Sequence, residues 1–599
     1  MIFSYLKNKT VHKEEWTGSF DESVDAAVVG LGTAGAIALI SAGRQGLSTI
    51  GIEQNSFMGG VGTGGAIHMY YYGTLGGIQM EIDEKVQVFN KVYSPSGVQG
   101  FHPDVKKKVL EEEALKNNSQ IYYRSSVIGI ILDENKVVGV QVITPEGIKT
   151  IQTKFVIDAS GDAQACVLAG GDFTIGREID GMPQPYSAPR GMHNGKVSSA
   201  NFDAGYVNPT DADEISASIC NAQTLHLKDK FVEDSKLLYV SPHLGLREGR
   251  FIVGEDTLNF EQMLLEEKPA EWTMQTYAHH DNHSRDWAFE SDLAQEWVTI
   301  CSFWSRMTMA YVKPGIVIPK GIDGLLVAGR CVSIDHDTAQ TFRMQRDMQK
   351  LGEITGVMAG LSIKANCMAK DLPYNELSKE LQTNGCKPLP EKEKKWGDWI
   401  TDVSAIKEGL ASTYPGIAIW SIKRKGSSFI PNLVEWLDED GDDLFLKHVA
   451  FALTIVGDDS GKDILIGMVE ENDQGLATSK EIRTHFPQKR VHGALFGLGV
   501  LHVKESVETI KKFLVNHLND FQDVSQSVMA LLKIAEKHED VRESILDCIL
   551  GEIDTQSFKF ILEMQVSNGD QKSTCQDMKT FLIKHVKSKQ KEWLSAVCV

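Results

Sequence analysis

The sequence predicts an α/β fold through its first part, followed by an all-α region at its C-terminal end. Two observations lead to this prediction. Near the N-terminus, two short apolar and β-branched runs flank a glycine-rich turn and an alanine-rich segment, which gives the order strand, turn, helix, strand. From about residue 400 onward, helical periods dominate instead. At 599 residues the chain exceeds one hydrophobic core, so we expect several domains.

The N-terminal unit begins with a strand and a glycine-rich turn. Residues 24–29 form the apolar run, and Gly30-Leu31-Gly32-Thr33-Ala34-Gly35 follows at once. Gly30 permits a tight turn out of the strand, Gly32 lets a diphosphate approach the backbone, and Gly35 lets the next helix pack against the strand. The N-terminus of that helix, expected at 36–42, offers free N–H groups and a positive dipole end to phosphates.

The unit continues with an acidic residue suited to a nucleotide. A strand is expected at 49–52, and Glu53 stands at its end. An acid at this place accepts hydrogen bonds from the ribose of an adenosine. Because strand, glycines, helix, strand and acid occur in the required order, the segment predicts a Rossmann-type dinucleotide-binding unit. The alternative is a glycine-rich turn that binds nothing.

A second glycine-rich segment follows, Phe57-Met58-Gly59-Gly60-Val61-Gly62-Thr63-Gly64-Gly65. So many glycines indicate backbone pressed close to another group, here the rest of the diphosphate and a flavin ring. The segment therefore favours FAD over NAD, since the first fingerprint alone serves both cofactors. Taken by itself, it is also compatible with a flexible loop.

Further motifs follow in a fixed order over about residues 24 to 365. They are Phe155 to Asp162, Gly176-Arg177-Glu178 with Gln184-Pro185, Arg247-Glu248-Gly249-Arg250, and Leu325 to Cys331 with His336, Arg343, Gly352 and Gly356. Together with the two glycine-rich segments they resemble the FAD-dependent oxidoreductases of the two-dinucleotide-binding-domain type. The motifs resemble more closely a bacterial family of these enzymes whose genes are often found beside carbohydrate-degrading genes. A set of ordered motifs is far more specific than any one of them.

The resemblance implies FAD as the cofactor, bound non-covalently because no covalent-flavin histidine motif is evident. It also implies that strand 325–328 and Gly329 close over the cofactor from the side opposite the first unit. The dipole of the helix expected at about 347–363 would stabilise negative charge on the reduced flavin. The cofactor-binding residues that it implies are Gly30, Gly32, Thr33, Ala34, Gly35, Glu53, Gln54, Gly59, Gly60, Thr63, Val127, Ser160, Gly161, Asp162, Gly329, Arg330 and Gly352.

The sequence departs from the family pattern at two places. The family commonly has an apolar-Pro pair after the arginine that matches Arg343, whereas this chain has the more polar Met344-Gln345-Arg346-Asp347. The threonine that the family places before His336 is replaced by Asp335. Both departures fall where the flavin ring is expected, so the substrate is expected to differ from that of typical members.

A flavin dehydrogenase removes a hydride and a proton from its substrate, and a side chain takes the proton. His336 is the predicted base, because histidine titrates near working pH and because it stands just after a cofactor-contacting strand. Arg343 and Arg247 are predicted to anchor or orient substrate or flavin through their guanidinium groups. The alternatives are a buried structural histidine and structural ion pairs.

The run His279-His280-Asp281-Asn282-His283 invites a metal interpretation, since His279 and His283 would share a helix face. The residues near these histidines in the sequence do not complete a convincing set of metal ligands. We therefore expect a polar loop over the active site and no metal.

The composition limits the partners that we expect. A formal net charge of −20 argues against nucleic acid and against anionic lipid. No apolar run approaches a membrane span, and no apolar signal core begins the chain. The nine cysteines form no C-x-x-C pair, which argues against a zinc or iron–sulfur site. Their odd number is typical of reduced thiols. We expect a cytoplasmic protein.

The predicted domains are an N-terminal arm (1–20), an FAD-binding domain (21–175 and 313–372), an inserted mixed α+β substrate or cap domain (176–312), a linker (373–399) and a helical domain (400–599). In the last of these, similar apolar patterns begin at Ala418, Ala452, Ala494 and Ala530, about 34 to 42 residues apart. This spacing predicts HEAT-like stacked helix pairs, with an irregular bundle as the alternative. Such a region could cover the substrate entrance, form a homo-oligomer or dock a partner.

The sequence thus predicts an FAD-dependent dehydrogenase that passes a hydride from a small hydroxyl-bearing metabolite, by resemblance a sugar derivative, to flavin and then to an unknown electron acceptor. Two alternatives stay open. One is a helical-repeat scaffold whose FAD serves structure or sensing, and the other is a flavin-dependent isomerase or lyase without net redox.

Overall fold

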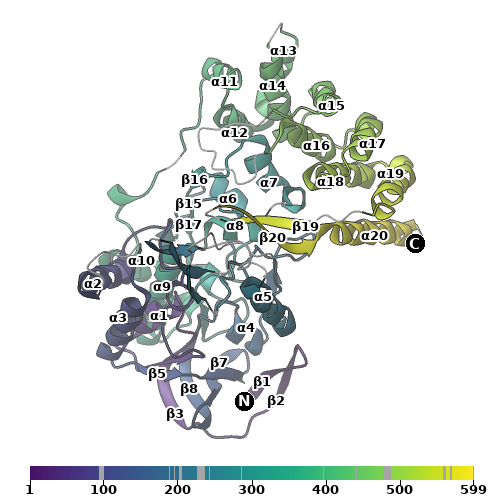
Figure 1. Ribbon diagram of the computed structural model, residues 1–599. Helices are drawn as coiled ribbons and strands as arrows, with labels where there is room; N and C mark the ends of the chain where they lie inside the picture. Colours follow the sequence, from purple (N-terminus) through teal and green to yellow (C-terminus); the bar gives the residue numbers. More distant parts are fainter. Residues whose placement is uncertain are drawn as a thin grey trace.

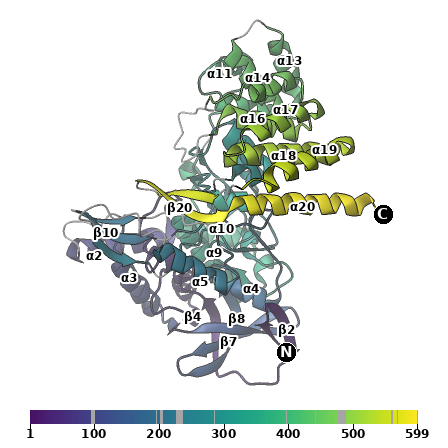
Figure 2. The ribbon, with the colours of Figure 1, turned by 45° about the vertical axis from the view of Figure 1, so that its right-hand side comes forward.

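The computed structural model describes residues 1–599 except 94–99, 188, 195, 201–205, 225–235, 242, 285, 396, 440–441, 476–487, 558–560, 567–568 and 598–599. A mixed α/β body contains about the first two thirds of the chain, and a helical region stands on it (Figures 1 and 2). Within the described residues, no helix combines the length and the apolar character needed to cross a bilayer.

One mixed sheet forms the base of the body. Its strands follow the order β2-β1-β6-β7-β8-β3-β4-β5, and β18 pairs with the second half of β8. The run β18-β8-β3-β4-β5 is parallel, and the run from β2 to β8 is antiparallel. The strands are β1 (Ile2–Lys7), β2 (Thr10–Glu15), β3 (Glu22–Val29), β4 (Thr49–Glu53), β5 (Gln120–Tyr123), β6 (Ser126–Asp133), β7 (Lys136–Thr144), β8 (Gly147–Asp158) and β18 (Leu325–Val327).

The helices of this body outside the inserted segment are α1 (Gly35–Arg44), α2 (Gly77–Tyr93), α3 (Pro103–Lys116), α4 (Gln164–Ala169), α8 (His336–Thr341), α9 (Gln345–Ala365) and α10 (Tyr374–Thr383). Helix α9 packs along α1, and its glycines make the close approach possible. A Cβ added to Gly352 would lie 2.1 Å from the carbonyl oxygen of Ala34, and one added to Gly356 would lie 2.5 Å from the Cβ of Ser41. The sequence-based prediction of a closely packed helix with these glycines is therefore confirmed.

The segment predicted as an N-terminal arm is part of the main sheet. β1 and β2 form a hairpin, and β1 also pairs with β6. The pairing of Tyr5 with Gly129 is one contact in this register. An antiparallel partner more than a hundred residues away cannot be recognised from local pattern, so the sequence predicted only an N-terminal arm here.

The inserted segment carries short strands and helices rather than one large sheet. They are β9 (Phe173–Ile175), β10 (Arg190–Asn194), β11 (Lys196–Ala200), α5 (Ala212–Thr224), β12 (Lys236–Val240), β13 (Arg250–Ile252), α6 (Phe260–Leu264), β14 (Met274–Gln275), β15 (Ala278–His279), α7 (Asp292–Gln295), β16 (Met307–Thr308) and β17 (Tyr311–Val312). The pairs β9–β13, β14–β17 and β15–β16 are antiparallel, as is the three-stranded sheet β11-β10-β12.

The C-terminal region consists mainly of helices: α11 (Val403–Leu410), α12 (Gly416–Lys425), α13 (Ile430–Leu437), α14 (Asp443–Ile455), α15 (Lys462–Glu470), α16 (Arg490–Val500), α17 (Val507–Asn516), α18 (Phe521–Lys537), α19 (Arg542–Ile549) and α20 (Met578–Val597). It also contains a hairpin of β19 (Ile561–Val566) and β20 (Gly569–Asp577), which the expectation of an all-α domain missed. Trp297 of the inserted segment meets Trp420 edge to face at 4.9 Å, so one apolar core continues from the body into this region.

The buried acid Glu353 on α9 fixes the start of α2. Its Oε2 accepts the N–H of Ile78 at 2.7 Å, whereas Oε1 is buried and has no hydrogen-bond partner. Burial raises the pKa of Glu353 to about 7, although the hydrogen bond from Ile78 and the charge of Lys350 act in the opposite direction. The folded protein therefore holds this acid protonated at a pH where the unfolded chain has ionised it, and stability is lost as the pH rises toward 7.

We expect Glu353→Gln to stabilise the protein more at pH 8 than at pH 5, because glutamine keeps the acceptor for Ile78 and has no proton to lose. The difference between the two pH values should amount to about 3 kcal/mol, measured as the shift in thermal or urea unfolding. The exposed Glu84→Gln on α2 is the matched control and should show no such pH dependence. Equal effects of E353Q at both pH values would contradict the assignment.

Candidate active site

The first glycine turn adopts a conformation that only glycine tolerates. Gly30 has a φ of +84°, and a Cβ added to it would lie 2.7 Å from the carbonyl oxygen of Ala159. A Cβ added to Gly35 would lie 1.8 Å from the carbonyl oxygen of Gly30. These contacts place the strand end, the turn and the start of α1 in the geometry of a diphosphate-binding turn.

Gly32, in contrast, faces open space. The nearest atom to an added Cβ is the Cα of Gly60, 3.9 Å away, although Gly32 lies in the middle of a closely packed turn. The second glycine-rich segment is held opposite by a hydrogen bond from the N–H of Gly59 to the carbonyl oxygen of Leu31 at 2.8 Å. Two glycine backbones therefore border a space that a side chain at position 32 would fill, which suits a diphosphate lying against bare backbone.

Glu53 is fixed at the end of β4. Its Oε2 accepts the N–H of Leu31 at 2.7 Å, and its Oε1 accepts both the N–H and the side-chain amide of Asn55 at 2.8 Å each. The carboxylate is thus tied to the glycine turn, where an acid would meet the ribose of a bound nucleotide.

Two more predicted segments converge on the same place. The N–H of Ala328 donates to the carbonyl oxygen of Asp158 at 2.8 Å, so β18 and β8 end side by side. A Cβ on Gly329 would lie 3.4 Å from the Cβ of Ala34, and one on Gly161 would lie 3.6 Å from the guanidinium of Arg330. The carboxyl ends of parallel strands, where α/β sheets bind ligands, therefore bring together the residues that the sequence assigns to the cofactor.

The other predicted cofactor residues lie in varied settings. Gln54 is exposed, and Val127 is buried in β6. The hydroxyl of Ser160 donates to Asp158 at 2.7 Å and that of Thr63 to the carbonyl oxygen of Met58 at 2.7 Å, so both stabilise their own turns. The remaining residues of the set, Thr33 and Asp162, lie in the first glycine turn and in the turn after β8.

The charged residues of the motif that contains Arg247 each contact a different partner. Arg250 pairs with Asp162 at 2.6 Å, so its charge serves a structural ion pair rather than a substrate. Arg247 itself donates to the carbonyl oxygen of Pro185 and is largely buried. Glu248, between them, turns toward His336.

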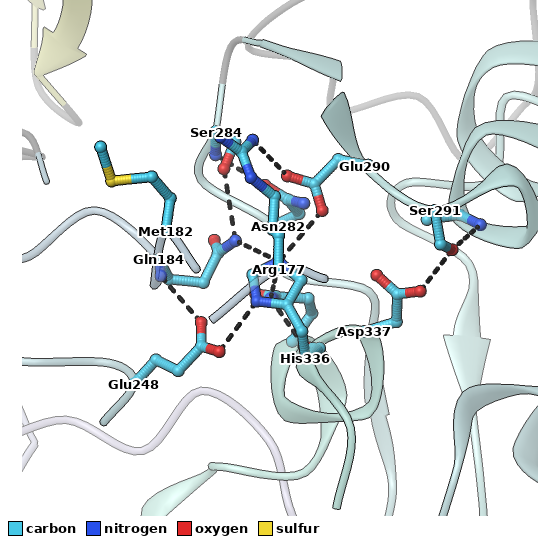
Figure 3. Close-up of polar contacts among 12 residues, drawn as sticks. Arg177, Met182, Gln184, Glu248, Asn282, Ser284, Glu290, Ser291, His336 and Asp337 are labelled. Carbon is cyan, nitrogen blue, oxygen red and sulfur yellow. Dashed lines mark hydrogen bonds and ion pairs between the residues drawn. The ribbon is translucent and has the colours of Figure 1, made fainter. Parts of the chain in front are cut away.

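His336, the predicted base, lies between two buried carboxylates (Figure 3). Its Nδ1 is 2.8 Å from Glu248 and its Nε2 is 3.1 Å from Glu290. Burial alone would lower the pKa of this histidine, but the charges of Glu248 and Glu290 outweigh it and raise the pKa well above its ordinary value. Both ring nitrogens are therefore engaged as donors, which favours a protonated imidazolium over the base expected from the sequence.

The same network extends to Arg177 (Figure 3). Its guanidinium pairs with Asp180 at 2.7 Å, Asp286 at 2.8 Å and Glu290 at 3.2 Å, and all four side chains are almost wholly buried. Burial raises the pKa of a carboxyl, but His336 and Arg177 lower that of Glu290 to about 2. Arg177 and Glu248 lie within motifs of the sequence that assign them no role, and no local signal in the sequence points to Glu290.

Among the described residues, one triad brings possible metal ligands together: Glu290, His336 and Asp337. Glu290 already pairs with His336 and Arg177, and Asp337 contacts the hydroxyl of Ser291. The negative charges near His336 are thus compensated by protein cations.

Arg343 belongs to a second polar cluster, which lies where the chain passes from α8 to α9. Its Nη2 is 2.7 Å from Oδ2 of Asp281 and 2.8 Å from the carbonyl oxygen of the same residue. Oδ1 of Asp281 lies 3.2 Å from Nε2 of His279 and 3.1 Å from Nε2 of His283. Burial works against ionisation, yet these neighbours hold the pKa of Asp281 well below its ordinary value. The sequence had singled out these histidines but not the pairing with Arg343.

This second cluster adjoins the glycine-rich segments. Gln345, the first residue of α9, donates to the carbonyl oxygen of Ile67 at 2.6 Å, and a Cβ on Gly62 would collide with its side chain. The start of α9, with its positive dipole end, therefore lies against the segment 57–65, two residues beyond Arg343. Partial burial and the charge of Asp281 raise the pKa of Tyr71, and Arg247 acts in the opposite direction, so this tyrosine, 59% exposed, lies near both charges.

Comparison with known proteins supports the assignment of the fold and its cofactor. A family model described as "FAD dependent oxidoreductase" matches residues 25–236 and 206–381. No curated protein matches the chain.

Solved structures show more remote likeness. A geranylgeranyl bacteriochlorophyll reductase-like protein of Thermoplasma acidophilum is 15% identical, with a TM-score of 0.34, over 72% of this chain and 96% of that one. The anhydrotetracycline hydroxylase OxyS of Streptomyces rimosus is 11% identical, with a TM-score of 0.32, over 72% and 76%. A 3-ketosteroid dehydrogenase of Rhodococcus jostii is 12% identical, with a TM-score of 0.28, over 57% and 98%. Scores this low carry no argument about activity.

The family match, by contrast, spans more than half of the chain and contains every segment that builds the glycine-lined site. The chain belongs to the FAD dependent oxidoreductase family.

Proposed function

We propose that this FAD-dependent oxidoreductase is a dehydrogenase that removes a hydride and a proton from a small hydroxyl-bearing metabolite, with a sugar derivative as the first class to test. The observation that carries the proposal is the cluster of Asp281, Arg343 and two histidines at the start of α9. It supplies a hydrogen-bonding cation and titratable bases beside the segments that would hold the flavin.

The residues present fit FAD. The glycine turn at 30–35 and the backbone of Gly60 would hold the diphosphate, and Glu53 would hold the ribose. When bound, FAD supplies a two-electron acceptor for the hydride. The start of α9 would place a positive dipole end where negative charge develops on reduction.

The chain's own side chains would supply substrate binding and proton transfer. Arg343, fixed by Asp281, presents a planar set of donors suited to a substrate hydroxyl or carboxylate. In this proposal His336 is a buried positive charge held by Glu248 and Glu290. It is not the proton acceptor that the sequence suggested. The side chain of Asp281 is 20% exposed and that of His283 is 18% exposed, which supports access from solvent to the second cluster.

An anaerobic screen tests the proposal. FAD-loaded protein is mixed with sugars, polyols and hydroxy acids, and loss of the oxidised flavin absorbance is followed. We expect at least one class to bleach the flavin and to yield the corresponding carbonyl compound. A flavin that chemical reductants bleach but none of these compounds does would contradict the proposal. If a compound is converted to product with no electron acceptor present and with no net reduction of the flavin, the isomerase or lyase alternative is favoured instead.

A further inference from the structure

His279 has one ring nitrogen paired and the other without a partner. Its Nε2 lies 3.2 Å from Oδ1 of Asp281, and its Nδ1 is buried with no hydrogen-bond partner. The residue as a whole is 8% exposed. A buried polar atom that lacks a partner destabilises the fold, so a structure retains one only where something compensates.

The surroundings fix the orientation of this ring. Tyr72 meets it edge to face at 4.8 Å, and Trp304 packs on it at 4.8 Å with a tilt of 53°. Its backbone belongs to β15, which lies beside α8, and its carbonyl oxygen accepts the hydroxyl of Thr341 at 3.3 Å. Two aromatic walls and a carboxylate therefore hold the imidazole in one orientation, as a proton-transfer group requires.

Asp281 sets which ring nitrogen carries the proton. A carboxylate accepts the Nε2–H of a neutral imidazole, which leaves the lone pair on Nδ1. Arg343 secures that carboxylate from its other side through Oδ2 at 2.7 Å. The unpartnered nitrogen of His279 is thus an acceptor that lacks a donor, and a substrate hydroxyl would provide one.

The walls of this site come from the segments that meet the cofactor region. Tyr72 follows the glycine-rich segment 57–65, and the N–H of Gly73 donates to the carbonyl oxygen of Tyr277 at 2.9 Å. Arg343 stands two residues before α9, whose first residue Gln345 packs on Gly62. His279 therefore contacts Tyr72, which follows the glycine-rich segment, and Asp281, which pairs with the arginine that precedes α9.

The other histidines nearby fit this role less well. Both nitrogens of His336 face carboxylates. His280 is wholly buried between Phe260 and Trp287, and burial lowers its pKa to about 3. His283 shares Asp281 with His279 but contacts further groups, and its side chain is 18% exposed.

We propose that His279, oriented by Asp281, is the catalytic base that accepts the proton of the substrate hydroxyl on Nδ1. The inference rests on the dehydrogenase function proposed above. In the step, the O–H bond breaks and its proton moves to His279, the C–H bond breaks and its electron pair leaves with the hydrogen as hydride to FAD, and a carbonyl group forms.

The first test needs no substrate. FAD-loaded protein containing ¹⁵N-labelled histidine is studied by NMR, and the signal lost in His279→Gln identifies the ring. We expect a neutral imidazole with its proton on Nε2, and we expect Asp281→Asn to change the distribution of the proton between the two nitrogens. A ring protonated on Nδ1, or one insensitive to D281N, would overturn the proposal.

The second test uses a compound that bleaches the wild-type flavin. H279Q should slow flavin reduction by about 10²- to 10⁴-fold while FAD content and reduction by dithionite stay unchanged. His283→Gln, which removes the other histidine on the same carboxylate, should cost less. A wild-type rate in H279Q, or a larger loss in H283Q than in H279Q, would overturn the assignment. If no compound bleaches the wild-type flavin, the proposed function fails while the NMR result still decides on the His279–Asp281 pair.

The pH profile adds a readout that a structural role would not change. The wild-type rate should fall toward acid pH, because a protonated imidazole cannot accept a proton, and the residual rate of H279Q should lack this fall. The charged and titratable groups that face His279 are Asp281, with His283 and Arg343 behind it, the neighbouring His280, and Tyr72 from the opposite wall. A fall that persists unchanged in H279Q would contradict the proposal.

Discussion

Replacing Gly32 by valine is expected to weaken FAD binding strongly while the apoprotein keeps its stability. The added side chain meets no atom nearer than 3.9 Å from its Cβ, so the empty protein has room for it. That room is the space assigned to the diphosphate. Each hydrogen bond from a backbone N–H to a charged group contributes about 1.5–3 kcal/mol, and loss of two of them lowers affinity by about two orders of magnitude or more.

The measurement is a titration of apoprotein with FAD, followed by quenching of flavin fluorescence, beside a thermal unfolding curve of each apoprotein. Gly467→Val is the matched control, because Gly467 lies in α15 with no atom within 4 Å of an added Cβ. It should leave FAD affinity unchanged. Wild-type affinity in G32V would show that the diphosphate lies elsewhere. Should G32V prove unstable, Gly32→Ala repeats the comparison with a smaller side chain.

Replacing Arg177 by methionine is expected to destabilise the protein by about 3–5 kcal/mol, because it leaves buried charges without their cation. Asp286 and Glu290 have fully buried side chains, and Asp180 is 5% exposed. Their carboxylates lie within 3.2 Å of the guanidinium in the folded protein. Without it, they must either take up protons or repel one another in a region that excludes water.

Thermal and urea unfolding of R177M measure the loss. Arg44→Met is the matched control, since Arg44 is 30% exposed and pairs with the exposed Glu81, where an ion pair contributes about 0–1 kcal/mol. Arg44 also lies 3.5 Å from the buried Glu113, but Lys85 and Lys116 remain beside that carboxylate in the variant. The double variant R177M/E290Q should recover part of the loss, because it removes one of the unpaired charges. An R177M protein as stable as R44M would refute the claim that this network is held together by Arg177.

The N-terminal unit could be predicted because its determinants are local. The turn at Gly30 to Gly35 and Glu53 follow one another within one strand–helix–strand unit, and backbone sterics at Gly30 and Gly35 allow few alternatives. The helix with Gly352 and Gly356 was predicted for the same reason, since the spacing of small residues on one helix face is visible in the sequence.

The networks around the active site could not be predicted, because their partners are distant in sequence. Glu248 and Glu290 reach His336 from 88 and 46 residues away. Whether a histidine becomes a base or a fixed imidazolium depends on such neighbours, and local sequence does not contain them. The hairpins β1–β2 and β19–β20 were missed for a related reason, since packing elsewhere decides whether short, partly polar segments become strands.

The central claim is that the site oxidises a hydroxyl-bearing carbon by hydride transfer to FAD, and a deuterium comparison tests it most directly. A compound that bleaches the flavin is offered in two forms, with hydrogen or with deuterium on the carbon that bears the hydroxyl, and the anaerobic rate of flavin reduction is measured for each. We predict slower bleaching by the deuterated form, with one deuterium fewer on that carbon in the carbonyl product. Equal rates together with deuterium retained in the product would contradict the account.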